Sequence, residues 1–189
     1  MLTLAVMIFD LFLYASIILI IFRLSRAIWM RLSFMKKLKR ICNNKKYTLN
    51  KLRSPLVSIF CKSDKIDLIV DTKENVYNVK FISSLSRKKV YHFVDANNYI
   101  TYLKFYFALP MATKFNESIL FLSYHKFPTV KKNNRENEKY VILFNPVPNE
   151  TTHIGDDGAR HVTGNGAMIE DFYVYNANGF CSFIKDGTC

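Results

Sequence analysis

The sequence predicts an α+β protein in which an N-terminal transmembrane helix and a basic juxtamembrane helix precede a predominantly β soluble domain. Three observations predict this fold class. Residues 2–22 are almost all apolar, residues 23–53 are strongly basic, and residues from 54 onward contain short runs of β-branched and aromatic side chains. A length of 189 residues suits one domain with an appendage, and an apolar content of 50% is enough to form a core. A disordered polyelectrolyte, a collagen and a repeat array are excluded.

The first segment, residues 1–22, is predicted to be a retained transmembrane anchor. Leu2 to Phe22 is a 21-residue run with a single charge, Asp10. Because a helix rises about 1.5 Å per residue, such a run matches a hydrocarbon core of about 30 Å. A cleaved signal peptide is the alternative, but it needs basic residues before the apolar run and a small-residue cleavage site after it. No Lys or Arg precedes this run, and Arg-Leu-Ser follows it.

The charges beside the anchor predict its orientation. Between Asp10 and Asp64 there is no acidic residue, whereas there are twelve Lys or Arg residues, all C-terminal to the apolar run. Positive charges near a membrane helix stay on the cytoplasmic side. We therefore expect a single-pass protein of the cell membrane with its N-terminus outside and its C-terminal domain in the cytoplasm. Asp10 either reaches the outer interface through helix tilt, which we prefer, or pairs with a helix of another membrane protein.

Residues 23–53 are predicted to be a basic amphipathic segment at the membrane surface. Apolar residues recur near helical spacing at Ile28, Leu32, Met35, Leu38 and Ile41. Such a helix continues out of the bilayer or lies along the inner leaflet, where each basic residue contributes about 1 kcal/mol toward binding anionic lipid. Nucleic acid would use the same charges, but no known motif or aromatic-interleaved groove supports it. We expect the membrane-surface residues to be Arg23, Arg26, Trp29, Arg31, Lys36, Lys37, Lys39 and Arg40.

Residues 54–189 are predicted to form a β-rich cytoplasmic domain. Ser54-Pro55 marks its start, because a residue that precedes proline disfavours helix. The period-two alternation of residues 76–82 is typical of a half-buried strand, and the polar residues 130–139 are expected to form a solvated loop. The predicted strands are Leu56–Cys61, Ile66–Val70, Val76–Ile82, Val90–Val94, Tyr99–Phe107, Ile119–Tyr124, Tyr140–Val147 and Phe172–Ile184.

The positions of the glycines predict turns near the C-terminus. All six glycines lie at or beyond Gly155, so the preceding residues contain no phosphate-binding loop and no dinucleotide-binding glycine turn. Asp157-Gly158, Asn165-Gly166 and Asn178-Gly179 are dipeptides that favour hairpin turns, since glycine accepts a positive φ. We therefore expect a small β-meander over residues 150–189.

One local pattern resembles the core of the PD-(D/E)xK nucleases. Asp67 is followed on the next predicted strand by Asn78 and Lys80, which share a face. In that family an Asp and an acidic-x-Lys unit hold Mg²⁺ and position the attacking water. Two departures weaken the resemblance: Ile66 stands in place of the proline, and the neutral Asn78 replaces the acid. An ordinary strand with a polar face is the alternative that we prefer.

Other groups of reactive residues are scattered. Cys42, Cys61, Cys181 and Cys189 form no close pair in sequence, and a zinc site from His153, His161 and Cys181 would require a coincidence of folding. We expect no metal site and no cofactor, and the thiols of a cytoplasmic domain should be reduced.

Over most of its length the chain also resembles an uncharacterised family of bacterial single-pass membrane-anchored proteins. The resemblance is carried by the N-terminal anchor and by the segments IDLIVDTKENVYNVKFISSLSRKKVYHFVD, YVILFNPVP and GNGAMIEDFYVYNANGF. It implies an architecture and assigns no catalytic residue. Three functions remain open: a membrane-tethered interaction or scaffold module at the inner leaflet, which we prefer, a membrane-associated nuclease-like domain that is active or degenerate, and a subunit of a membrane complex.

Overall fold

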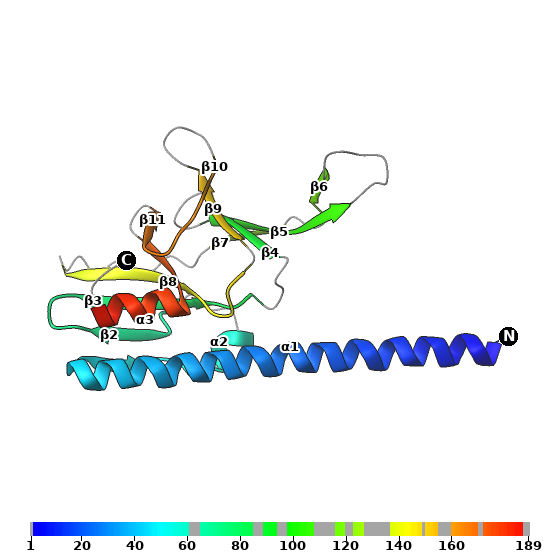
Figure 1. Ribbon diagram of the computed structural model, residues 1–189, viewed down its shortest axis with the longest axis horizontal. Helices are drawn as coiled ribbons and strands as arrows, with labels where there is room; N and C mark the ends of the chain where they lie inside the picture. The colour runs from blue at the N-terminus through cyan, green and yellow to red at the C-terminus, as the bar shows by residue number, and fades with distance from the viewer. Residues whose placement is uncertain are drawn as a thin grey trace.

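The computed structural model describes residues 2–60, 65–84, 89–93, 98–107, 116–119, 123–126, 137–148, 150–154, 160–169 and 172–186. A long N-terminal helix is followed by a sheet-rich domain (Figure 1), so the predicted α+β class is confirmed. The described helices are α1 (Leu2–Lys45), α2 (Val57–Phe60) and α3 (Ala177–Asp186).

Helix α1 is continuous across the boundary that the sequence suggested at residue 22. It runs for 44 residues without interruption, so it is about 66 Å long. Its N-terminal half projects away from the sheets, and its C-terminal half lies along the domain (Figure 1). The basic segment therefore continues as a helix out of the predicted anchor instead of forming a separate surface helix. Lys46, with a φ of 58°, follows the last helical residue, and the chain then enters a strand.

The first sheet is mixed and contains six strands in the order β1-β2-β3-β8-β12-β11. Its two central pairs, β3 with β8 and β8 with β12, are parallel, and the outer pairs are antiparallel. Strand β8 reads EKYVILF and is buried on both faces, as is typical of a central strand. The bounds are β1 (Thr48–Lys51), β2 (Leu68–Asp71), β3 (Val76–Ile82), β8 (Glu138–Phe144), β11 (Ala167–Ile169) and β12 (Phe172–Asn176).

The second sheet follows the order β10-β9-β4-β5-β6, and β7 also pairs with β5. Strands β4 and β9 are parallel, whereas β5 is antiparallel to β4, β6 and β7. The bounds are β4 (Lys89–Phe93), β5 (Asn98–Phe107), β6 (Asn116–Ile119), β7 (Ser123–Lys126), β9 (Glu150–Ile154) and β10 (Arg160–Val162).

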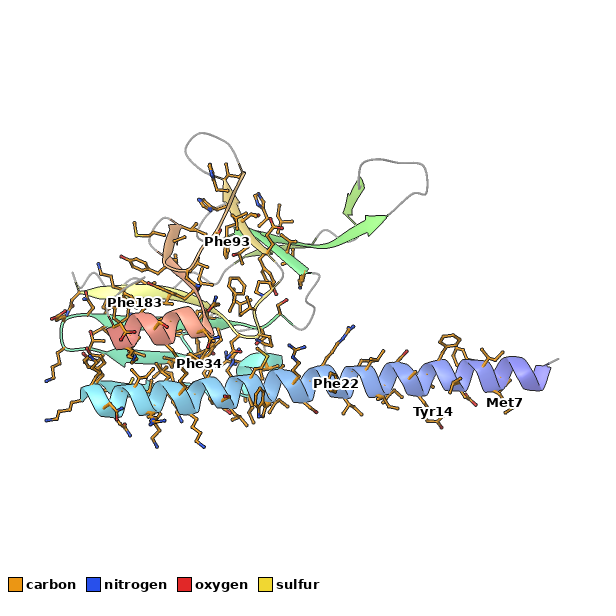
Figure 2. All side chains as sticks on the ribbon, in the orientation of Figure 1. Met7, Tyr14, Phe22, Phe34, Phe93 and Phe183 are labelled. Carbon is orange, nitrogen blue, oxygen red and sulfur yellow. The ribbon has the colours of Figure 1, made fainter. Side chains whose placement is uncertain are left out.

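The core has two parts, one on each face of the first sheet. On one face, α1 and α3 pack on residues such as Val79 and Leu143. On the other face, Tyr91 and Phe93 of the second sheet pack against Ile142 and Phe144. Figure 2 shows Phe34 between α1 and the first sheet, and Phe93 on the opposite side of that sheet. Strand β3, which the sequence predicted to be half-buried, is buried on both faces and contributes Val79 to the first cluster and Ile82 to the second.

Three elements differ from the sequence-based predictions. Residues 57–60 form the short helix α2 in place of a strand. The strand predicted over Tyr140–Val147 ends at Phe144, two residues before Pro146, which has no N–H to donate to a ladder. The strand predicted over 172–184 ends at Asn176, where α3 begins.

The predicted β-meander over 150–189 is wrong. Strands β9 and β10 belong to the second sheet, whereas β11 and β12 belong to the first. Asn178-Gly179 is not a hairpin turn: it lies in the first turn of α3, whose N-terminus is capped by the Asn176 side chain accepting a hydrogen bond from Gly179 N at 2.8 Å. Gly166, with a φ of 79°, does occupy a turn. Asp157-Gly158 and residues 130–136 lie outside the described residues.

Candidate functional site

The two halves of α1 have opposite surroundings. Along residues 6–22 the large apolar side chains are exposed, including Phe12 at 69% and Phe22 at 65%, and no part of the most apolar 18-residue window is buried. From residue 27 onward one face of the same helix is buried in the domain, with Phe34 at 5% exposure and Leu38 at 0%. One helix is therefore long and apolar enough to span a membrane, and its continuation is part of the core.

Arg31 lies at the junction between these halves and is fully buried. Its Nη1 donates to Ser58 Oγ at 2.9 Å, and its Nη2 donates to Ser83 Oγ and to the Asn145 carbonyl oxygen, each at 2.7 Å. The guanidinium also lies 3.6 Å from the centroid of the Phe81 ring, a cation–π contact. This single side chain therefore joins α1 to α2, to the end of β3 and to the turn after β8.

Asn145 is the counterpart of Arg31 on the sheet side. Its backbone N–H donates to Ile82 O at 3.0 Å, and its side-chain amide donates to Met30 O at 3.4 Å. The carbonyl oxygen accepts a hydrogen bond from Ser83 Oγ at 3.1 Å as well as from Arg31. Among the residues that the structure describes, the polar groups at this corner thus satisfy one another, except that Arg31 Nε has no hydrogen-bond partner there.

Burial lowers the pKa of the Arg31 guanidinium to about 9, and the nearby Asp67 carboxylate opposes that shift. Arg31 therefore stays protonated at neutral pH, and the junction contains a buried positive charge. The prediction that Arg31 belongs to the membrane-surface set is wrong, because the side chain points into the domain. The spacing of apolar residues did not indicate the buried face of α1 correctly. That face carries Ala27, Arg31 and Cys42, whereas Leu32, which was expected on the apolar face, is 49% exposed.

A cleft of about 310 Å³ adjoins this corner on the outside of the domain. It lies between α1, the turn after β8 and the start of α3. Trp29, Phe34 and Lys37 line it from α1, and Val147 and Asn178 line it from the other side. Trp29 is 69% exposed, so the cleft opens beside the only tryptophan of the chain.

The other predicted membrane-surface residues are all exposed, as the sequence suggested: Arg23, Arg26, Trp29, Lys36, Lys37, Lys39 and Arg40. They share the sides of α1 that do not pack on the sheet. Asp10 is also exposed on the N-terminal half of α1. Contacts of these residues with lipid or with another protein stay predictions.

The candidate nuclease residues form a closed ion-pair network. Asp67 is buried, and its carboxylate lies 3.3 Å from Arg53 Nη1 and 3.2 Å from Lys80 Nζ. Phe81 N donates to Asp67 Oδ2 at 2.9 Å, and Lys80 Nζ donates to Lys65 O at 2.7 Å.

Asn78 and Lys80 share one face of β3, as predicted, and Val79 lies on the opposite face. Both oxygens of Asp67 are engaged by protein donors, so the arrangement neutralises a buried carboxylate and connects the residues after β1 to β3. It does not present a second acid beside Asp67, and the part of the chain that the structure describes contains no group of three or more His, Cys, Asp or Glu residues that could hold a metal ion.

Two free cysteines meet where α1 crosses α3. Cys42 and Cys181 are both buried in the cluster on that face of the first sheet. Burial raises the pKa of Cys181 to about 11, Lys37 opposes the shift, and Cys42 adds to it.

His153 and His161 lie side by side with ring centroids 5.8 Å apart, and His153 Nδ1 is 3.1 Å from Thr163 Oγ1. Cys181 packs between α3 and the first sheet, whereas His153 and His161 pair in the second sheet, so the three residues that a zinc site would need are not brought together.

Comparisons with known proteins add no assignment: no protein-family model, no curated protein and no solved structure matches this chain.

Proposed function

We propose that this protein is a single-pass membrane-anchored interaction module that holds its sheet-rich domain at the cytoplasmic face of the membrane. The observation that carries the proposal is the dual role of α1, whose exposed apolar half continues without a break into a half that is buried in the domain core. An anchor joined to its domain by a flexible linker lets the domain rotate freely. Here the anchor is itself a core element, so the domain takes a fixed orientation relative to the membrane.

The exposed basic residues Lys36, Lys37, Lys39 and Arg40, here called the basic face of α1, bear on what the protein binds. Lys36 to Arg40 lie 14 to 18 residues beyond Phe22, which corresponds to about 21–27 Å along a helix. That distance exceeds the screening length of about 8 Å at physiological salt, so these charges act little on lipid headgroups when α1 is upright. Arg23 and Arg26 are close enough to bind anionic lipid. The distal charges support binding of an acidic protein surface that approaches the membrane.

Membrane insertion and orientation are tested together. The full chain should remain with membranes after carbonate and high-salt washes, and a reporter fused after Cys189 should be active only in the cytoplasm. Release by carbonate contradicts the anchor. A reporter that is active only outside the cytoplasm contradicts the orientation.

The partner surface is tested by site-specific photo-crosslinking in cells. A photoreactive residue at Leu32, which is 49% exposed beside the basic face, should give a discrete protein adduct. Charge reversal at Lys36, Lys37, Lys39 and Arg40 should remove that adduct. The matched control places the photoreactive residue at Met168, which is 59% exposed on β11, and should give none. An adduct that survives charge reversal contradicts the electrostatic role.

The nuclease-like alternative has less support. Its candidate residues Asp67 and Lys80 pair with each other, and Asn78 supplies no charge for a divalent cation. The alternative of a complex subunit rests on Asp10 alone, whose replacement by leucine should abolish assembly if that carboxylate pairs with another helix.

A further inference from the structure

The cleft of about 310 Å³ beside α1 is small and largely apolar. Trp29, Ser33 and Lys37 line one wall at four-residue spacing along the helix, which places them on one side of α1. The turn after β8 and the first residues of α3 line the other wall, and Phe34, which is 5% exposed, closes the base. The volume is at the lower end of the range for ligand pockets, so the cleft suits one large side chain better than a whole cofactor.

Two large apolar side chains of the cleft remain exposed. Trp29 is 69% exposed, and Val147 on the opposite wall is 44% exposed. Ser33 and Asn178 supply polar groups beside them. Exposed apolar surface with a polar rim marks interaction sites, and tryptophan is among the residues that contribute most to binding at protein interfaces. A side chain that fills the cleft removes this apolar surface from water.

Hydrogen bonds hold the two walls of the cleft together. Met30 lines the cleft from α1 and Asn145 lines it from the turn after β8, and the Asn145 side-chain amide donates to Met30 O at 3.4 Å. Arg31 Nη2 donates to the Asn145 carbonyl oxygen at 2.7 Å. These bonds fix the separation of α1 from the turn, so the cleft exists before a partner arrives. A preorganised site loses less conformational entropy when it binds.

The charge at the cleft is complementary to an acidic partner. Among the described residues that line it, Lys37 is the only charged one. Lys37 also belongs to the basic face of α1, and α1 contains no acidic residue after Asp10. The cleft therefore borders the basic face, and an acidic segment that binds there can pair with it.

The position of the cleft along α1 places it beyond the lipid. Trp29 lies seven residues past Phe22 and Lys37 lies fifteen, which correspond to about 10 Å and 22 Å along a helix. The headgroup layer on each side of a bilayer is about 5–8 Å thick. When α1 is upright, the cleft faces water, which favours a protein segment over a lipid headgroup.

We propose that this cleft binds an acidic segment of a partner protein, with one apolar side chain of that segment between Trp29 and Val147 and a carboxylate beside Lys37. The proposal rests on the proposed interaction module and names the chemistry of its partner. The apolar contact provides an anchor, and the charge pair selects acidic segments over basic ones.

The fluorescence of Trp29 tests the site in the full chain, because it is the only tryptophan. The protein is reconstituted in phosphatidylcholine bicelles and titrated with short peptides in which one leucine or one phenylalanine is flanked by glutamates. We expect a saturable change in the emission of Trp29 and protection from acrylamide quenching. A peptide with alanine at the central position should bind about tenfold more weakly, because it buries less apolar surface. Absence of a saturable change with both the leucine and the phenylalanine peptide overturns the proposal.

A matched pair of charge reversals separates the cleft from the general charge of α1. Lys37→Glu removes the cation of the cleft, whereas Lys39→Glu makes the same change at an exposed residue of α1 that does not line it. Lys37→Glu should weaken binding of the leucine peptide about tenfold, and Lys39→Glu should weaken it less than about threefold. Val147→Asp should prevent binding, since it places a carboxylate in the apolar part of the cleft. Equal losses in the two lysine variants overturn the assignment to the cleft.

Two further measurements distinguish the cleft from the anchor and from lipid. Phosphatidylglycerol that is brominated near the headgroup end of its acyl chains should quench Trp29 little, and strong quenching shows that lipid occupies the cleft and overturns the proposal. The same protein in vesicles is washed with carbonate. A protein that stays with the vesicles but binds neither peptide overturns the cleft and leaves the anchor intact, whereas release by carbonate overturns the anchor. Photo-crosslinking at Leu32 tests the interaction module independently of these peptides.

Discussion

The guanidinium of Arg31 donates a 2.7 Å hydrogen bond to the carbonyl oxygen of Asn145, and this bond joins two residues that are 114 positions apart. Arg31 is on the helix that continues from the apolar segment, and Asn145 directly follows the central strand β8 of the first sheet. The contact fixes the angle at which α1 leaves the domain. It also places a buried positive charge about 13 Å from the end of the apolar run.

Replacement of Arg31 by methionine should lower the free energy of unfolding by about 2 kcal/mol, because three hydrogen bonds from a charged donor are lost while its desolvation is relieved. Arg31→Lys should be intermediate, since an ammonium cannot reproduce the planar fork. Urea denaturation in detergent measures both variants. A change below about 0.5 kcal/mol in Arg31→Met contradicts a structural role for the corner.

The effect of Arg31 should also have a specific pH profile. The folded-state pKa is about 9, well below the ordinary value of a guanidinium, so both states are protonated below pH 9. The difference between the wild type and Arg31→Met should therefore be constant from about pH 6 to 8. Above pH 9 the unfolded state binds the proton more tightly than the folded state does, so the contribution of Arg31 to stability should rise.

The second half of α1 should behave as core and not as a dispensable linker. Phe34 is 5% exposed and packs edge-to-face on Phe81 with ring centroids 5.8 Å apart. Phe34→Ala should cost about 3–5 kcal/mol of stability. The matched control is Trp29→Ala on the same helix, where a side chain that is 69% exposed should change the unfolding midpoint little. Equal effects of the two substitutions contradict the separation of the two faces.

The sequence predicted the class of the fold and failed where tertiary contacts decide. Strand β3 and the helical character of residues 23–45 follow from local periodicity, and both are present. Arg31 was misplaced because charge alone predicts exposure, whereas its burial depends on Ser83 and Asn145, which are distant in sequence. Asn145 does carry a local signal, since it is a polar residue between an apolar strand and a proline.

Helix α3 was predicted wrongly as a turn and strand, because a local turn preference was given too much weight. Asn178-Gly179 favours a turn by itself, but Phe180, Cys181 and Ile184 are buried at helical spacing against α1 and the sheet. Packing and the Asn176 cap outweighed the local turn preference. To predict the pairing of Asp67 with Arg53 one must know which strands are neighbours in the sheet, and a single sequence does not show this.

Native Cys181 should be nearly inert toward alkylating reagents. Burial raises its pKa to about 11, so the reactive thiolate is scarce at neutral pH. In a Cys61→Ser, Cys189→Ser background, iodoacetamide at pH 8 should label Cys42 and Cys181 only after denaturation. Because the folded pKa is raised, the contribution of Cys181 to stability is present below about pH 9 and falls as the pH rises toward 11. Rapid labelling of the native protein, read by mass spectrometry, contradicts the buried packing of α1 on α3.

The last prediction concerns the pairing of Asp67 with Lys80. Removal of one member leaves the other buried, so Asp67→Asn and Lys80→Met should each cost about 3 kcal/mol, and the double variant should cost less than the sum of the two. The coupling reports an ion pair that serves the fold, because both Asp67 oxygens already accept hydrogen bonds or ion pairs from Arg53, Lys80 and Phe81 N. A metal-dependent nuclease would need those same oxygens for a divalent cation, with a second acid where Asn78 stands. Titration of the purified protein with Mg²⁺ or Mn²⁺ should therefore give no saturable binding, and plasmid DNA should stay intact with the wild type and with Lys80→Ala. Metal-dependent nicking by the wild type that disappears in Lys80→Ala would show that the network opens to bind metal, and would establish catalysis at this site.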